Sequence, residues 1–345
     1  MAYVLLGILG LALLMVVHEG GHYLAARAFG MRVTKFSIGF GPALLRKKPE
    51  GSPTTYQVAL LPFLAYVQIA GMNPLEEVDP NDRGSYANAS LIGRSVTIFA
   101  GPLANYLFAS VLFFASLVIG GQEVLTTRVD VAPDGAAAAA HMLPGDKIVE
   151  VAGERITDWD RTRKVILAHP GEEIDVAVER EGAGTVHLKV RPTPTGEHGG
   201  GRIGVAARTA MVPVPTGRAA ALAVEQPARI VVGLVVGLAR MITGQERPEL
   251  SGPVGIVRET AKAVRRGLPD ALGFLGALSA YLGGFNLLPF PALDGGRMMF
   301  LGYEAATRRR PNARVEAQVH FVGLAMMLAL IVVVTVVSDL PGRGH

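Results

Sequence analysis

The sequence contains no cysteine and little charge. None of its 345 residues is cysteine, which excludes disulfide frameworks, thiolate zinc sites, iron–sulfur clusters and cysteine nucleophiles. Any metal must therefore be bound by His, Asp or Glu. Charged residues make up 18% of the chain, below the roughly 25% of soluble domains. Because hydrophobic residues reach 50% and gather in blocks, we expect much of the chain to be buried in lipid rather than in one large core.

Aromatic residues are also scarce, at 6%, although the net charge is +4. A basic chain could bind nucleic acid, but here the basic residues stand beside apolar blocks. Membrane topology explains this distribution better, and no nucleic-acid partner is expected.

Four apolar segments are long enough to cross a bilayer. They cover about residues 3–30, 96–119, 271–288 and 319–337, each near the roughly 20 residues that a spanning helix needs. A further apolar stretch at residues 230–242 is shorter and carries Arg240 near its end, so we interpret it as an interfacial or partly inserted helix. A signal peptide is disfavoured because no basic region precedes the first apolar run.

Lysine and arginine predict how these segments are oriented. The connection after the first span and the connection between the third and fourth spans are both basic. Their basic residues are Arg27, Arg32, Lys35, Arg46, Lys47 and Lys48 in the first, and Arg308, Arg309, Arg310 and Arg314 in the second. Since short cytoplasmic loops are enriched in Lys and Arg, both connections are expected in the cytoplasm, with the chain ends and residues 121–270 outside.

Two segments predict β-structure. Alternating apolar residues at 174–178 and 186–190 indicate strands of a soluble domain at residues 121–208. Residues 36–72, between the first two spans, contain strand-like runs. An apolar hairpin formed by these runs would be prone to aggregation if it were free. We therefore expect this hairpin to fold back against the spans within a first region, residues 1–120. Residues 209–270 are expected as an amphipathic connection, and residues 271–345 as the last two spans.

The first span contains the run His18-Glu19-Gly20-Gly21-His22. Positions four apart point to nearly the same side of a helix, so one metal ion can bridge both imidazoles while Glu19 lies beside them. This pattern is typical of two zinc ligands and a general base. The alternative is a set of polar residues hydrogen-bonded at the end of a span. A carboxylate at membrane depth costs roughly 2.5–3.5 kcal/mol, which favours a functional role.

A catalytic zinc site needs a third protein ligand and an open fourth position. Asp294 is the better candidate, because Pro289 and Pro291 break the preceding helix at about the depth of His18. His320, at the start of the fourth span, is a possible rival. Taken alone, Asp294 could equally well cap the helix that follows.

Five motifs occur along the chain in order. They are His18–His22, Phe36–Pro42, Gly101–Asn105, Ser251–Ile256 and Asn286–Gly296. Together they resemble the site-2 protease family of intramembrane zinc metalloproteases, in its bacterial regulator-of-sigma-E protease branch. The resemblance covers essentially the whole chain.

The resemblance implies a polytopic α-helical membrane protein with four transmembrane helices, a membrane-reentrant β-hairpin at about 36–72 and one inserted extracytoplasmic PDZ domain of α+β type. The run Leu143–Ile148 is similar to a PDZ turn and strand. The length of residues 121–208 accommodates one such domain, whereas some family members carry two. The expected location is the bacterial cytoplasmic (inner) membrane, with the active site near the cytoplasmic side.

The resemblance also implies the chemistry. His18, His22 and Asp294 would bind Zn²⁺ and Glu19 would act as general base. Asn286 would lie near the substrate carbonyl. Pro289, Tyr66 and Val67 are further expected substrate contacts, the last two through pairing of an unwound substrate with the hairpin edge. The implied substrates are single-pass membrane proteins, such as anti-sigma factors and signal-peptide remnants, that another protease has already trimmed.

Two functions of other classes stay open at this point. A non-catalytic membrane scaffold that presents a PDZ domain would be favoured by loss of Glu19 or of a ligand candidate, and none is lost. A metal transporter predicts polar residues along several spans, whereas residues 319–337 have almost none after His320.

Overall fold

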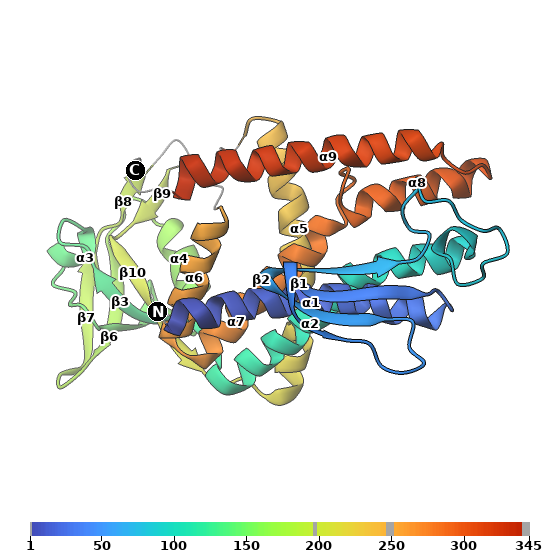
Figure 1. Ribbon diagram of the computed structural model, residues 1–345. Coiled ribbons are helices and arrows are strands. Elements are labelled where there is room, and N and C mark those ends of the chain that lie inside the picture. Colours follow the sequence, from blue (N-terminus) through green and yellow to red (C-terminus); the bar gives the residue numbers. More distant parts are fainter. Residues whose placement is uncertain (1, 196–198, 246–251, 340–345) are drawn as a thin grey trace. The chain divides into compact units, whose positions relative to one another are not determined.

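The chain divides into two compact units in the computed structural model, which describes residues 2–195, 199–245 and 252–339 (Figure 1). The first unit is mainly helical and combines the part of the chain up to Gly120 with the part from Pro215 onward. The second unit, Gly121–Val214, is mainly β-structure. Ser251, the first residue of one sequence motif, lies outside the described residues.

The helices of the first unit follow the apolar runs of the sequence. They are α1 (Ala2–Ala28), η1 (Tyr86–Asn88), α2 (Leu91–Gly120), α5 (Thr216–Ile242), α6 (Pro253–Arg266), α7 (Leu268–Asn286), α8 (Asp294–Thr307) and α9 (Ala313–Val334), which continues as the π-helical turn η2 (Thr335–Asp339).

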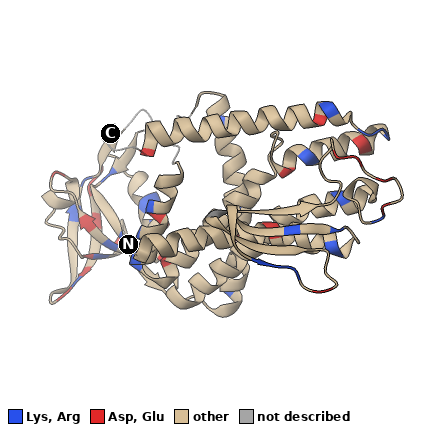
Figure 2. Cartoon of the chain, viewed as in Figure 1, with Lys and Arg blue, Asp and Glu red and all other residues tan. Residues whose placement is uncertain are grey.

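Four of the described helices are long and apolar enough to cross a membrane: α1, α2, α5 and the helix Ala313–Asp339 formed by α9 with η2. The last carries its Asp, Glu, Lys and Arg residues only near its two ends (Figure 2). The number agrees with the sequence prediction, but the set differs. The segment predicted as the third span forms α7, whose 19 residues include four glycines and Asp270, and these lower its hydropathy.

The segment at 230–242, which we interpreted as a short interfacial helix, instead belongs to the 27-residue helix α5. The sequence prediction began this element too late, because Arg229 and Glu225 interrupt the apolar pattern. Their side chains pair with each other one helical turn apart, and the helix continues through them. In Figure 1, α5 runs transverse to α9, so these two long apolar helices are not parallel to each other.

Glycines allow α1 and α7 to pack closely against α2. A Cβ added at Gly21 in α1 would lie 2.2 Å from the Ala100 carbonyl oxygen. A Cβ at Gly283 in α7 would lie 2.8 Å from the Pro102 carbonyl oxygen. Small residues at helix contacts permit such close approach of backbones in membrane proteins. Helix α2 is therefore a shared surface on which the elements of the site converge.

A β-hairpin lies against α1. Strands β1 (Val33–Lys47) and β2 (Thr55–Ile69) pair antiparallel with several register shifts. Its base is buried, because Val33 and Ile69 pack with Ala26 of α1. The Tyr23 and Tyr56 hydroxyls lie 2.6 Å apart and link α1 to β2. The hairpin thus begins slightly earlier than the predicted segment 36–72.

The second unit is built around a twisted antiparallel sheet with the strand order β10-β3-β4-β6-β7, and β5 pairs with β4. A further pair, β8 and β9, stands apart from it. The elements are β3 (Gln122–Val131), α3 (Ala136–Ala139), β4 (Lys147–Val151), β5 (Glu154–Arg155), α4 (Trp159–Leu167), β6 (Ile174–Arg180), β7 (Gly184–Val190), β8 (Thr193–Thr195), β9 (Gly200–Arg202) and β10 (Val205–Val212).

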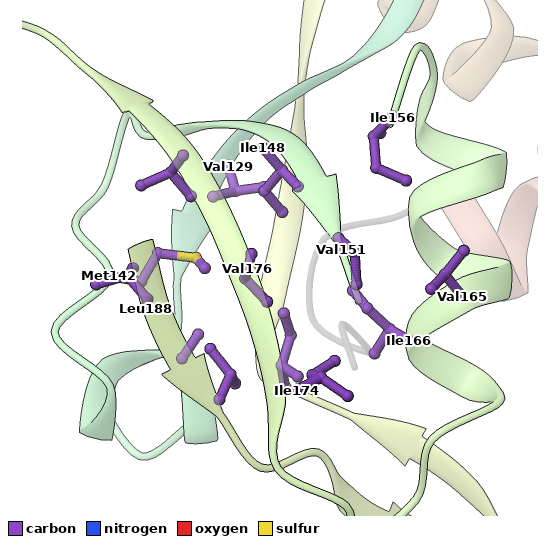
Figure 3. Close-up of a cluster of buried hydrophobic side chains, with 14 residues drawn as sticks. Val129, Met142, Ile148, Val151, Ile156, Val165, Ile166, Ile174, Val176 and Leu188 are labelled. Carbon is purple, nitrogen blue, oxygen red and sulfur yellow. The ribbon is translucent and has the colours of Figure 1, made fainter. Parts of the chain in front are cut away.

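The core of this unit contains the residues that the alternating pattern placed inward. Ile174, Val176 and Leu188 are buried and belong to one apolar cluster (Figure 3). The unit ends at Val214 rather than at residue 208, because β10 continues to Val212 and pairs there with Gln122 at the start of β3. The sequence prediction missed this strand, since residues 205–212 lack a clear alternation of apolar and polar residues.

Candidate metal centre

His18 and His22 share one buried face of α1. Only 4% of His18 and 6% of His22 is exposed. Their four-residue spacing brings the two Nε2 atoms to 3.3 Å from each other, as the helical geometry requires. Both imidazoles therefore present the same ring atom to one point inside the first unit.

Asp294 lies at that point. Its Oδ2 atom is 3.1 Å from His18 Nε2 and 3.3 Å from His22 Nε2. Asp294 is the first residue of α8, the N-cap position is occupied by Leu293, and no side chain caps the helix. The carboxylate is thus turned toward the histidines and does not cap α8.

The three atoms fit a zinc ion. Bonds of 2.0–2.1 Å in a tetrahedral site place neighbouring ligand atoms about 3.3 Å apart, and the observed separations are 3.1 to 3.3 Å. Asp294 Oδ2 is buried and makes no hydrogen bond among the described residues. A buried carboxylate oxygen without a hydrogen bond needs another partner. In the described part of the chain, His18, His22 and Asp294 form the group that could hold a metal ion.

The turn before Asp294 is tightly folded. A Cβ at Gly295 would lie 2.1 Å from the Leu288 carbonyl oxygen, so the chain passes directly over the start of α8. Ala292 has a left-handed φ of 74°, a conformation that costs a non-glycine residue energy. His320 Nδ1 accepts a hydrogen bond from the Ala292 N–H at 3.0 Å. The rival ligand His320 therefore supports the turn and is not part of the three-residue group.

Helix α2 supplies contacts that the sequence did not predict. His22 Nδ1 donates to the Thr97 carbonyl oxygen at 2.8 Å, and because a carbonyl only accepts, Nε2 keeps its lone pair for a metal. His18 Nδ1 lies 3.1 Å from the amide nitrogen of Asn105. A Cβ at Gly101 would lie 2.3 Å from His22 Nε2. The motif Gly101–Asn105 was visible in the sequence, but nothing in it showed which residues face the histidines.

Glu19 contacts the hairpin. Its Oε2 accepts a hydrogen bond from the Val67 N–H at 3.0 Å, so β2 reaches the candidate site through its backbone. The neighbouring Tyr66 hydroxyl accepts a hydrogen bond from Gln57 Nε2 at 3.4 Å. Of these two predicted substrate contacts, Val67 therefore lies beside the expected general base, and the Tyr66 side chain contacts Gln57.

Asn286 is the last residue of α7, and Pro289 lies between α7 and α8. The Asn286 amide nitrogen donates to the Leu282 carbonyl of its own helix at 2.9 Å. Pro289 lines a largely apolar cavity of about 560 Å³ together with Pro291, Phe300 and Val319. Among the described hydrogen bonds, none joins Asn286 to the three candidate ligands.

Comparison with known proteins shows the family of this chain. Residues 6–330 match peptidase family M50. The chain belongs to this family. The protease is 33% identical over 346 residues to a candidate zinc metalloprotease of Rhizobium meliloti, covering 93% of this chain and 92% of that protein. It is 30% identical over 417 residues to zinc metalloprotease RasP of Geobacillus kaustophilus, covering 93% and 94%.

These matches decide among the classes that the sequence left open. The protein is a zinc metalloprotease, and its apolar helices agree with a membrane protein. The scaffold and transporter interpretations are therefore set aside.

Proposed function

We propose that this metalloprotease cleaves single-pass membrane proteins within or near their membrane span, with His18, His22 and Asp294 as the zinc ligands and Glu19 as the general base. The observation that carries the proposal is the convergence of three ligand atoms on one point beside α1, a helix long and apolar enough to cross a membrane. Ionisable groups at such a position are rarely retained without a function.

The residues around the proposed ligands suit peptide hydrolysis. A zinc ion held there supplies Lewis acidity, which polarises a carbonyl and makes water acidic enough to lose a proton near neutral pH. Glu19 takes that proton and delivers it to the leaving amine. The Val67 N–H restrains one carboxylate oxygen of Glu19. The other oxygen then serves as the base.

The hairpin is suited to hold substrate. A helical span keeps its carbonyls in internal hydrogen bonds, so it must unwind before attack. The amide of Val67 lies beside Glu19, which places this part of β2 next to the proposed catalytic groups. An unwound segment could add as a strand to this edge near Tyr66 and Val67. Asn286 would bind the substrate carbonyl after its side chain leaves the Leu282 carbonyl, and Pro289 would line the path of the substrate.

The second unit would select substrates. Its small sheet, the helix α4 and the Leu143–Ile148 turn support a PDZ domain. A cavity of about 370 Å³ between α4 and the start of β10 is lined by Trp159, Ile166 and Val205. Since β10 is an edge strand, this cavity could accept a peptide end, and the unit could also exclude bulky substrates. Substrates would then be membrane proteins already trimmed by another protease, such as anti-sigma factors or signal-peptide remnants.

The proposed location is the bacterial inner membrane. Basic residues in the hairpin region and between α8 and α9 favour the cytoplasm for both connections. The PDZ unit would be extracytoplasmic and the active site would lie near the cytoplasmic side. Reporter fusions at Glu50 and at Gly182 should then report opposite sides of the membrane.

The test of the activity is Glu19→Gln in the full-length protein, reconstituted into liposomes with a panel of single-pass proteins shortened on the outer side. We expect the variant to bind zinc as the wild type does and to leave these substrates uncut. Glu77→Gln changes an exposed carboxylate in the same way and should cleave normally. Cleavage by the Glu19→Gln variant at the wild-type rate would refute the proposed role of Glu19.

A further inference from the structure

Asn105 is the side chain next to the ring nitrogen of His18 that faces away from the candidate zinc ligands. It is 0% exposed, and its amide nitrogen lies 3.1 Å from His18 Nδ1. The backbone carbonyl of Asn105 accepts a hydrogen bond from Ser279 Oγ at 2.9 Å. The side chain of Asn105 therefore faces α1, and its backbone is bonded to α7.

The other atom of this amide is unsatisfied. Asn105 Oδ1 is buried and has no hydrogen-bond partner in the described part of the chain. The oxygen and nitrogen of an asparagine amide exchange places by a half-turn of the side chain, and their assignment follows from the hydrogen bonds that each can make. The tautomer of His18 therefore decides which amide atom faces it.

The geometry at Nε2 determines that tautomer. His18 Nε2 faces Asp294 Oδ2 at 3.1 Å and His22 Nε2 at 3.3 Å. A neutral imidazole that binds a metal through Nε2 carries its proton on Nδ1, which must then donate. An amide nitrogen has no lone pair with which to accept. Of the two amide atoms, only the Asn105 oxygen can accept a hydrogen bond from His18 Nδ1–H, and it is the atom that otherwise lacks a partner.

We propose that Asn105 is a positioning residue: in the zinc-loaded protein its Oδ1 accepts a hydrogen bond from His18 Nδ1–H and fixes the ring and its tautomer. The Thr97 carbonyl performs the same task for His22, so α2 orients both histidines of α1. Partners of this kind hold metal-binding histidines in place and strengthen metal binding. The inference rests on the zinc site assigned under the proposed function.

Two substitutions separate an accepting amide from a donating one. Zinc affinity is measured by competition with a chromogenic chelator on the full-length protein in detergent micelles. Asn105→Leu keeps the size but removes the acceptor, and we expect zinc to bind about 10–100-fold more weakly. Asn105→Asp can only accept from Nδ1–H, and we expect affinity equal to or tighter than wild type. Equal weakening in both variants would overturn the proposal, because it would mean that the amide donates or is only structural.

Ser279→Ala is the matched control. It removes the hydroxyl that bonds the backbone of Asn105 and leaves the amide intact, so zinc affinity should stay at the wild-type value. If Ser279→Ala weakens binding as much as Asn105→Leu, packing at this residue explains the effect and the proposal fails.

His22→Ala separates this inference from the zinc site itself. If His22→Ala loses zinc while Asn105→Leu binds like wild type, the site stands and only the role of Asn105 fails. If His22→Ala also binds like wild type, the zinc site is wrong.

Should the aspartate variant not fold, nitrogen-15 spectra of histidine-labelled, zinc-loaded wild type provide the test. A His18 Nδ1–H signal that shifts in Asn105→Leu supports the proposal, and a signal that stays unchanged in that variant overturns it.

Discussion

At the residue scale, the space around the two glycines of the His18–His22 run differs sharply. A Cβ at Gly21 would lie 2.2 Å from the Ala100 carbonyl oxygen and 2.8 Å from the Ala104 Cβ, whereas nothing lies within 4 Å of a Cβ at Gly20. The backbone of α2 cannot move aside as a flexible side chain can. Gly21 therefore sets the distance between the histidines and the α2 groups that orient them.

We expect Gly21→Ala to push α1 away from α2 and to lower both zinc content and thermal stability. Overpacking of a well-packed contact typically costs about 1–3 kcal/mol. Gly20→Ala is the matched control, and its effect should be small or stabilising, because alanine favours a helix over glycine by about 1 kcal/mol. Metal analysis and thermal unfolding in detergent measure both effects, and equal losses in the two variants would contradict this account.

Asp146 of the second unit provides a pH-dependent contribution to stability. Burial raises the pKa of this carboxyl, whereas hydrogen bonds from Arg180 and from the Leu143 N–H lower it. The lowering is the larger effect, so the pKa of Asp146 lies below its ordinary value. Arg180 Nη2 donates to Asp146 Oδ2 at 2.7 Å. Because the folded pKa is depressed, the stabilisation is complete above the unfolded pKa of about 4 and is lost as the pH falls through the folded pKa.

Chemical unfolding of residues 121–214 between pH 7 and pH 2 should therefore show a fall in the free energy of unfolding that begins near pH 4, where unfolded aspartate starts to take up protons. Asp146→Asn should be less stable at pH 7 and should flatten this part of the curve. Asp175→Asn, at an exposed carboxyl, is the control and should keep the wild-type slope. An unchanged slope in Asp146→Asn would show that other carboxyls cause the effect.

At the element scale, a buried ion pair joins α2 to the helix that carries Asp294. Arg94 Nη1 and Nη2 donate to the two carboxylate oxygens of Glu304 at 2.9 and 2.6 Å. The side chains are only 9% and 14% exposed. Such a two-bond contact fixes the rotation of α8 relative to α2. Its position at the far end of α8 from Asp294 gives this helix two fixed points.

Glu304→Gln should destabilise the protein by up to about 3–5 kcal/mol, because it removes the carboxylate that is hydrogen-bonded to the buried Arg94 guanidinium. Zinc content should fall with it, since Asp294 is on the same helix. Glu259→Gln breaks a half-exposed pair with Lys262 and should cost about 0–1 kcal/mol. Thermal unfolding and metal analysis of the two variants provide the measurement, and similar costs would show that the Arg94 charge is solvated or otherwise paired.

At the scale of the whole molecule, the β-rich unit is inserted into the helical one at a single place. Gln122 and Val212 face each other on the paired strands β3 and β10, so the unit begins and ends at neighbouring positions of one sheet. Closely spaced termini are what allow a domain to be inserted into another without disturbing it. The unit also has its own apolar core.

We therefore expect residues 121–214, produced alone, to fold cooperatively and to unfold at the same temperature with and without a chelator. In the full-length protease, removal of zinc by the same chelator should abolish cleavage and added zinc should restore it. Circular dichroism of the isolated unit and a cleavage assay of the full chain test the two parts. An unfolded isolated unit would show that its stability depends on the helices.

The sequence predicted part of this arrangement because part of it is local. The histidine spacing on a helix, the apolar blocks and the alternating strands follow from periodicity within one element. The predicted start of the apolar segment at 230–242 has the same origin. Arg229 suggested the start of a short segment, whereas α5 runs through this residue from Thr216 to Ile242.

By itself, the sequence determined that any metal must be bound by His, Asp or Glu, and that His18 and His22 face one side of α1. Only the tertiary structure decided that Asp294 turns toward them instead of capping α8, that Glu19 meets the backbone of β2, and that Asn105 lies behind His18. These contacts join residues from different helices and strands. They depend on the short distance at which glycine lets two backbones pack, and the residue pattern of a single segment does not reveal that distance.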